Sequence, residues 1–190
     1  TVLGMVQARL DALGVEAKRL CKAASIFGES AWAGGVAYVL GAENATEEID
    51  GELRALAERE VLERRASGRF SGEREYVFRH ALLRDAAYEL MLDEDRAAMH
   101  LRAGEWLEAH GEHDALVVAR HFERGRAVDR AGPHLRRAAE QALYGSDFAA
   151  AIACAEQALS CGVSSETDIV LGPPTLYPPP DLDLGATAFS

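Results

Sequence analysis

His80, near the middle of the chain, has the surroundings of a ligand-contacting residue. It stands where the pattern changes from a strand, in residues 76–78, to a helix in which Leu83, Ala87 and Leu90 recur at helical spacing. A side chain at such a junction is held by rigid elements on both sides, and its imidazole can act as a hydrogen-bond donor or a cation. The sequence therefore predicts that His80 contacts a ligand or a neighbouring domain. The alternative is a structural histidine that satisfies backbone groups at the strand end.

Other residues capable of chemistry form weaker patterns. His110 and His113, near Glu108 and Glu112, are too loosely spaced to predict a metal site. The three cysteines include no Cys-x-x-Cys pair, which argues against a zinc site or a disulfide framework and suits a reducing cytoplasm. No Ser-His-Asp or Cys-His pattern and no Gly-x-x-x-x-Gly-Lys-Ser/Thr loop occurs. We therefore expect no metal site and no catalytic residues in this chain.

The elements that would position His80 fill residues 1–92. Helices are expected over residues 5–13 and 15–27, over 30–40 with Ser30 as the N-cap, and over a fourth segment that begins at a capping box of Asn44 and Glu47. Two short strands, around residues 61–65 and 75–78, follow as a hairpin. Helices followed by a hairpin are typical of a winged-helix domain. Its expected core is Leu20, Ala24, Val36, Leu40, Leu53, Leu56, Val61, Val77 and Phe78.

Residues 93–162 are expected to be almost entirely helical, so the predicted fold class is mainly α. Ala139, Ala151 and Ala158 recur at spacings that resemble a tetratricopeptide repeat, in which small residues let two antiparallel helices approach and Phe148 fills the gap between them. One such pair cannot bury its faces alone, so it needs further repeats or the preceding helices. Residues 163–190 are proline-rich and are expected to be a linker or tail.

Composition narrows the possible functions. The 190 residues carry a formal net charge of −11, which disfavours nucleic-acid binding because phosphate backbones attract clustered Lys and Arg. No run approaches the roughly 18 apolar residues of a membrane span, and no secretory signal is visible. We therefore expect a cytoplasmic chain that makes no membrane contact, and its opening inside an amphipathic pattern suggests a part of something larger.

The chain from about residue 5 to residue 159 resembles the region that follows the nucleotide-binding core in bacterial STAND-type signalling ATPases. The most specific part of the resemblance is Phe78-Arg79-His80-Ala81-Leu82-Leu83-Arg84-Asp85-Ala86-Ala87-Tyr88. The resemblance implies a winged helix, tetratricopeptide-like helical hairpins and a preceding AAA-type ATPase domain as partner. It also implies that ADP or ATP is bound by the parent protein and that this chain holds no cofactor.

In related NTPases, a winged-helix histidine within a Met-His-Asp-like motif reaches the phosphates of bound ADP and holds the closed state. His80 matches that histidine by position, so the resemblance implies a nucleotide-sensing role for His80 and its neighbour Arg79, although Arg79 and Ala81 depart from the motif. Arg96 and His100 stand one helical turn apart and are expected to form a polar edge facing the helix after His80 or the ATPase core. Together with Arg84 they are the candidate interaction residues.

The sequence also fits two other functions. The chain could be an adaptor whose acidic helical surface binds a partner protein with no nucleotide involved. In the nucleotide-switched interpretation, the helical repeats bind a protein or a small ligand. A DNA-binding winged helix is disfavoured because the candidate recognition helix is rich in Glu and Asp, while the hairpin with Arg64, Arg65 and Arg69 is only slightly basic. His121 and His134 are expected to be surface or packing residues.

Overall fold

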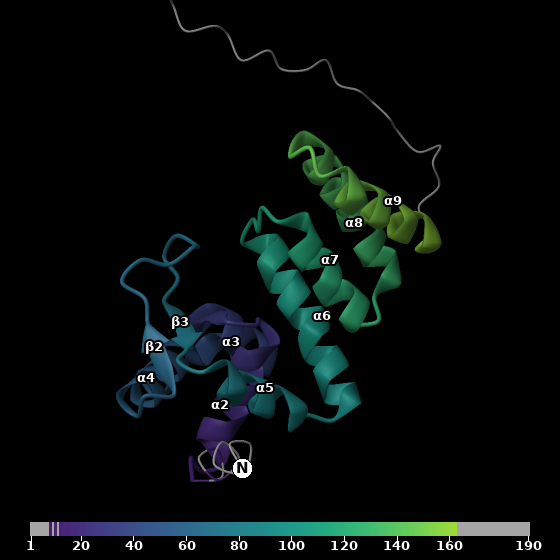
Figure 1. Ribbon diagram of the computed structural model, residues 1–190. Coiled ribbons are helices and arrows are strands. Elements are labelled where there is room, and N and C mark those ends of the chain that lie inside the picture. The colour runs from purple at the N-terminus through teal and green to yellow at the C-terminus, as the bar shows by residue number, and fades with distance from the viewer. Residues whose placement is uncertain (1–7, 9, 11, 163–190) are drawn as a thin grey trace, which may run out of the picture.

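A computed structural model describes residues 8, 10 and 12–162 of the chain. Within these residues the fold is mainly α, with eight α-helices and a small antiparallel sheet of three strands (Figure 1). No helix in the described part is both long and apolar enough to cross a membrane. The elements in chain order are α2 (Val15–Ile26), β1 (Ser30–Trp32), α3 (Ala33–Leu40), the 3-10 helix η1 (Glu43–Ala45), α4 (Thr46–Glu58), β2 (Leu62–Arg64), β3 (Glu75–Phe78), α5 (Ala81–Glu89), α6 (Asp93–Ala109), α7 (Ala115–Arg124), α8 (Val128–Tyr144) and α9 (Phe148–Ser160).

The sheet has the strand order β1-β3-β2, with both pairs antiparallel. The hairpin of β2 and β3 confirms the sequence prediction, but the N-cap assigned to Ser30 is wrong. Ser30 belongs to β1 and lies opposite Val77 of β3. A strand of three residues is too short to show a two-residue period. Helix α3 begins only at Ala33, and its first turn is capped from a distance, because Gly34 donates its N–H to a Glu73 carboxylate oxygen at 3.0 Å.

The predicted capping box before α4 is also wrong. Asn44 lies inside η1, and the N-cap position of α4 is held by Ala45, whose side chain caps nothing. Thr46 instead donates its hydroxyl to the Glu43 carbonyl at 2.9 Å. The helix itself is confirmed, because Ile49, Leu53 and Leu56 form its buried stripe.

The first core lies among α2, α3, α4, α5 and the sheet. Of the core positions that the sequence predicted, Leu40 is only partly buried and the others are buried. The predicted junction is confirmed as well, since β3 ends at Phe78 and α5 starts at Ala81. The described residues of the predicted helix 5–13 are too few to test it, and the predicted tail of residues 163–190 lies outside the described part of the chain.

A second core of aromatic side chains joins this N-terminal half to the C-terminal helices. The Trp32 ring stacks on Trp106 of α6 with centroids 5.6 Å apart, and Phe70, from the loop between β2 and β3, contacts both rings edge-on. Phe27 packs against the same two tryptophans. The tip of the hairpin is therefore fixed to α6.

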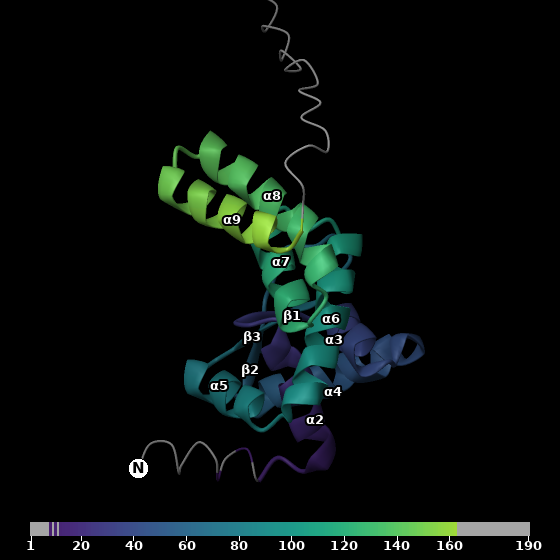
Figure 2. The ribbon, with the colours of Figure 1, turned by 90° about the vertical axis from the view of Figure 1, so that its right-hand side faces the viewer.

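The C-terminal helices α5 to α8 pack as consecutive antiparallel pairs, and α9 lies beside α8 (Figures 1 and 2). Ala139, Ala151 and Ala158 are buried, as their spacing predicted. Phe148 does not fill a gap between the helices, because 65% of it is exposed. It is the first residue of α9, directly after the N-cap Asp147.

Candidate functional site

His80 occupies the N-cap position of α5, on the surface of the protein. Its backbone is extended, with φ −135° and ψ 123°, and its carbonyl accepts hydrogen bonds from the N–H groups of Leu83 and Arg84. Its ring forms no hydrogen bond or ion pair with any described residue, and it is exposed. The His80 carbonyl therefore accepts the first hydrogen bonds of α5, while its imidazole can still bind a ligand or another domain.

Arg79, next to His80, is bound within its own half of the molecule. Its guanidinium pairs with the Glu60 carboxylate at 2.9 Å, and its backbone N–H donates to the Val61 carbonyl. These contacts tie the end of β3 to the turn between α4 and β2. Arg79 could turn to a nucleotide only by leaving Glu60.

Arg96 and His100, one helical turn apart on α6, both contact Tyr88 of α5. The Arg96 guanidinium lies over the Tyr88 ring, 4.6 Å from its centroid, and the Tyr88 hydroxyl lies 2.9 Å from Nε2 of His100. Arg96 also donates to the Met91 carbonyl. His100 is only 1% exposed, so it can influence a partner only through the residues around it.

His100 forms a buried pair with His121 of α7. Their Nδ1 atoms are 3.1 Å apart, and His121 is 6% exposed. Burial lowers the pKa of His100 to about 3, helped by the nearby charges of His121, Arg124 and Arg96. Burial and then Arg124 lower the pKa of His121 to about 4. Both rings are consequently neutral near pH 7.

The positions of the ring protons follow from these contacts. A phenol is a better donor than a neutral imidazole, so the Tyr88 O–H donates to Nε2 of His100. Nδ1 of His100 must then carry a proton and donate it to Nδ1 of His121. His121 keeps its own proton on Nε2, the remaining polar atom of its ring.

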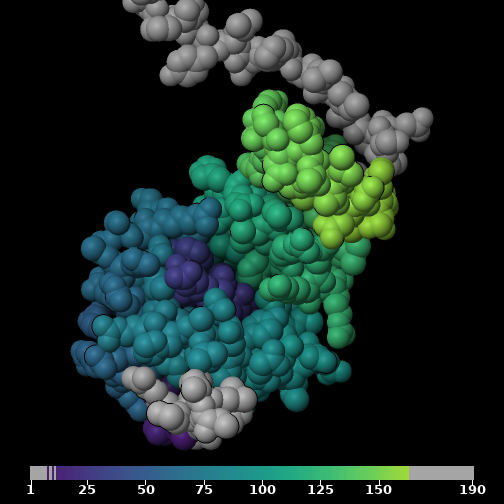
Figure 3. All heavy atoms as spheres, viewed as in Figure 1, coloured from purple at the N-terminus to yellow at the C-terminus, as the bar shows by residue number. Residues whose placement is uncertain are grey.

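His121 lines a groove between α5, α7 and the end of α2. The groove has a volume of about 470 Å³, and Arg84, Arg120 and Arg124 supply its positive charges. Figure 3 shows a strip of purple surface, from the early part of the chain, between the blue and teal N-terminal half and the green helices. Arg84 donates twice to the neighbouring Asp85, whereas Arg124 makes no ion pair with a described residue.

A smaller cavity of about 220 Å³ adjoins this groove. Tyr88 and Arg124 belong to both linings, and Arg96 and Arg126 face the second one. We call the two cavities together the arginine groove, defined by Arg84, Tyr88, Arg96, Arg120, His121, Arg124 and Arg126. It collects the predicted interaction residues Arg84, Arg96 and His100 around Tyr88, one or two turns along α5 from His80.

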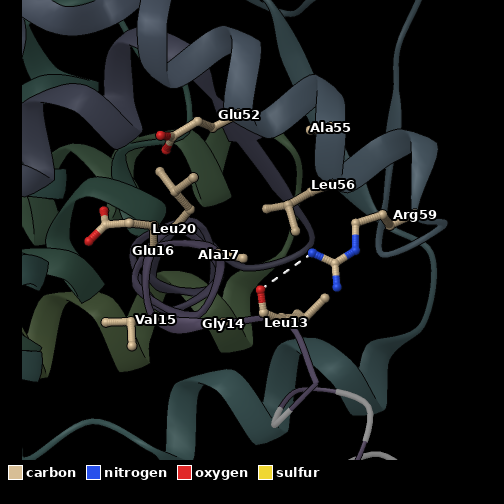
Figure 4. Close-up of a pocket in the computed structure, with 10 residues that line it drawn as sticks. All are labelled: Leu13, Gly14, Val15, Glu16, Ala17, Leu20, Glu52, Ala55, Leu56 and Arg59. Carbon is tan, nitrogen blue, oxygen red and sulfur yellow. Dashed lines mark hydrogen bonds between the residues drawn. The ribbon is translucent and has the colours of Figure 1, made fainter.

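A separate cavity of about 430 Å³ lies between the start of α2 and α4 (Figure 4). Leu13, Leu20 and Leu56 make much of its wall apolar. Figure 4 shows the Glu16 and Glu52 carboxylates on one side and the Arg59 guanidinium on the other, donating to the Leu13 carbonyl at 3.3 Å. This lining suits an apolar side chain better than a charged ligand.

Two of the residues considered for a metal site have other partners. His110 stacks on Trp106 and its Nδ1 lies 2.8 Å from the Trp106 carbonyl, while Glu112 is buried and pairs with Arg69. Among the described residues no three His, Cys, Asp or Glu side chains are placed to hold a metal ion.

No protein-family model, no curated protein and no solved structure matches this chain. Sequence reasoning missed Arg120, His121 and Arg124 as site residues. Their spacing places them on one side of α7, but only the packing of α7 on α6, whose His100 contacts both His121 and Tyr88, brings them near α5.

Proposed function

We propose that this chain is the regulatory and protein-interaction part of a nucleotide-switched bacterial signalling protein of the STAND type. The observation that carries the proposal is His80, whose ring is exposed and unengaged at the junction of β3 and α5. The order of helices, β1 and the later hairpin supports a winged-helix domain, and the small residues buried between α8 and α9 support tetratricopeptide-like packing.

In this proposal a separate domain of the parent protein holds ADP or ATP, in the cytoplasm, and this chain holds no cofactor. The face around His80 packs on that domain in the ADP state, with the imidazole near a phosphate. Exchange for ATP, or a ligand on the helical pairs, favours the open state by a population shift. The chain itself catalyses nothing.

The test is ADP release from the protein that carries this chain together with a nucleotide-binding domain. His80→Ala removes a hydrogen bond to a charged group, worth about 1.5–3 kcal/mol, so release should be at least tenfold faster. His113→Ala, at another exposed histidine, is the matched control and should release ADP at the wild-type rate. Equal rates for wild type and His80→Ala would refute the proposal, as would the absence of a phosphate-binding loop from the encoding gene.

A second candidate is an adaptor that binds a partner protein without nucleotide. Phe148, Ile152 and Leu159 lie on one face of α9, because they recur at helical spacing, and all three are largely exposed. If the adaptor uses this face, Ile152→Glu should abolish binding of the partner protein. The same substitution should not change the amount of nucleotide that copurifies with the parent protein. Loss of ADP retention on His80→Ala would favour the first candidate instead.

DNA binding has the least support. Two arginines of the hairpin are committed to carboxylates: Arg69 pairs with Glu112, and Arg74 pairs with Glu47 and Asp50. The face of α4 that carries Glu47 and Glu48 would repel a phosphate backbone.

A further inference from the structure

We propose that the arginine groove is a binding site for a small soluble molecule that carries two phosphoryl groups. It contrasts with the chain as a whole, whose formal net charge is −11. Five arginines line its two cavities, Arg84 and Arg120 in the larger one, Arg96 and Arg126 in the smaller one, and Arg124 in both. This inference rests on the groove alone and holds whether or not His80 senses a nucleotide.

The negative features of the lining are fewer than the positive ones. Asp85 is already bound by Arg84, and Asp93 is 3.6 Å from Arg96, so these two carboxylates neutralise two arginines in part. Arg120 has Glu123 at 3.7 Å. The carbonyl end of α2, at Phe27 and Gly28, adds a partial negative charge. Arg124 and Arg126 form no ion pair with a described residue, so their charges remain for a ligand.

His121 gives the groove a fixed neutral donor. Its Nδ1 is occupied by His100, which is held in turn by the Tyr88 hydroxyl, so the ring cannot turn to offer an acceptor without breaking this chain. Its Nε2–H is the polar atom left for the groove. A donor flanked on α7 by the guanidinium groups of Arg120 and Arg124 suits an anionic oxygen, since arginine binds phosphate through parallel N–H groups.

Two cavities that share Tyr88 and Arg124 in their linings favour two anionic groups over one. Arg124 lies at the boundary, with arginines on either side of it, which matches adjacent phosphoryl groups bridged by an oxygen. The larger cavity, about 470 Å³, has room for further atoms of the same molecule. A diphosphate is therefore the smallest probe that can engage both cavities.

The test is calorimetric titration of the chain with inorganic pyrophosphate at low salt without divalent cations. Arg124→Gln should weaken pyrophosphate binding at least tenfold, because it removes the cation shared by both cavities. Arg65→Gln makes the same charge change on the exposed hairpin and should alter the affinity less than twofold. Orthophosphate should bind at least tenfold more weakly than pyrophosphate, and ADP at least as tightly, because its diphosphate is attached to a molecule that can use the larger cavity.

The proposal fails if pyrophosphate does not bind, or if Arg124→Gln and Arg65→Gln weaken it equally, since the attraction would then be general. Equal affinity for orthophosphate and pyrophosphate would refute the two-group ligand. Pyrophosphate should also shift the Nε2 resonance of His121, and an unmoved resonance counts against the groove. His80→Ala should leave pyrophosphate binding unchanged. If His80→Ala abolishes it while Arg124→Gln does not, the anion binds at His80, which overturns the groove and leaves the proposed function standing.

Discussion

Nδ1 of His100 lies 3.1 Å from Nδ1 of His121, and both rings are buried between α5, α6 and α7. A contact between two imidazole nitrogens needs one proton, so two protonated rings cannot form it. The Tyr88 hydroxyl, 2.9 Å from Nε2 of His100, extends the chain of hydrogen bonds to α5. The hydrogen bonds that link α7 through α6 to α5 are therefore broken once both histidines are protonated.

Acid should destabilise the fold through this pair. The pKa values of about 3 for His100 and about 4 for His121 lie below the value of 6.5 expected after unfolding, so between pH 6.5 and 4 the unfolded chain binds protons that the folded chain does not. Their stabilisation is complete above pH 6.5 and is lost as the pH falls. From pH 6.5 to pH 5 each histidine should cost roughly 2 kcal/mol of unfolding free energy.

Urea unfolding at several pH values measures this effect. The double variant His100→Gln with His121→Gln keeps polar groups in place but does not titrate, so its unfolding free energy should fall less steeply below pH 6.5 than that of the wild type. His113→Ala, at an exposed position, should keep the wild-type slope. Identical slopes for the double variant and the wild type would contradict the prediction.

The buried carboxylate of Asp50 should contribute strongly to the free energy of unfolding. Asp50 is 1% exposed, accepts the Tyr76 hydroxyl at 2.7 Å and pairs with Arg54 and Arg74. Burial, followed by the bond to Asp50, raises the pKa of Tyr76 to about 12, so the phenol stays protonated as the donor. Asp50→Ala should cost about 2–4 kcal/mol, because it removes the acceptor of Arg54 and Arg74 and leaves the Tyr76 hydroxyl only the backbone carbonyl of residue 50, at 3.4 Å.

Tyr76→Phe should cost less, about 1 kcal/mol, since the carboxylate keeps its two arginines. Glu48→Ala, an exposed position on the same helix, is the control and should change stability by less than about 0.5 kcal/mol. Chemical denaturation of the three variants ranks them. A loss for Asp50→Ala no larger than that for Glu48→Ala would show that the network does not hold α4 to the sheet.

Phe70 should keep the hairpin loop docked on α6. Its ring lies 4.8 Å from Trp32 and 5.3 Å from Trp106, centroid to centroid, and it is buried. Phe70→Ala should release the loop, so trypsin should cut after Arg65 and Arg69 at least several-fold faster while the helices stay intact. Phe148→Ala makes the same change at an exposed ring and should leave the cleavage rate as it is. Unchanged cleavage in Phe70→Ala would mean that the aromatic contacts do not restrain the loop.

The elements with strong local patterns could be predicted from the sequence. Spacings of two residues predict strands, and spacings of three and four residues predict helices, because the backbone fixes these periods locally. Such spacings predicted the helical stripes, the hairpin and the strand-to-helix junction at His80. Strand β1 was missed because Ser30 is recruited by pairing with Val77, a contact between distant residues. Likewise, the first turn of α3 is capped by Glu73, which is distant in sequence, so no local motif predicts this cap.

In the candidate site, too, local spacing predicted some residues, whereas others are brought together only by tertiary packing. Arg96 and His100 could be placed together because they are one turn apart on a helix, and both do contact Tyr88. Arg120, His121 and Arg124 come from a different helix, and only tertiary packing joins them to Arg84. Phe148 was misplaced because a spacing shows which residues share a face without showing whether a neighbour covers it.

Ala151 should tolerate no larger side chain, because it is buried where α9 packs on α8. Ala151→Leu inserts three carbon atoms into this contact and should cost about 1–3 kcal/mol through overpacking. Ala153→Leu is the matched control, since Ala153 is exposed on the same helix and Leu is nearly as good a helix former as Ala. In thermal melting experiments, Ala151→Leu should therefore show a lower melting temperature than the wild type, and Ala153→Leu should melt close to the wild type. Equal melting temperatures for the two variants would show that α9 does not pack on α8 through this small residue, and would remove the main support for tetratricopeptide-like packing.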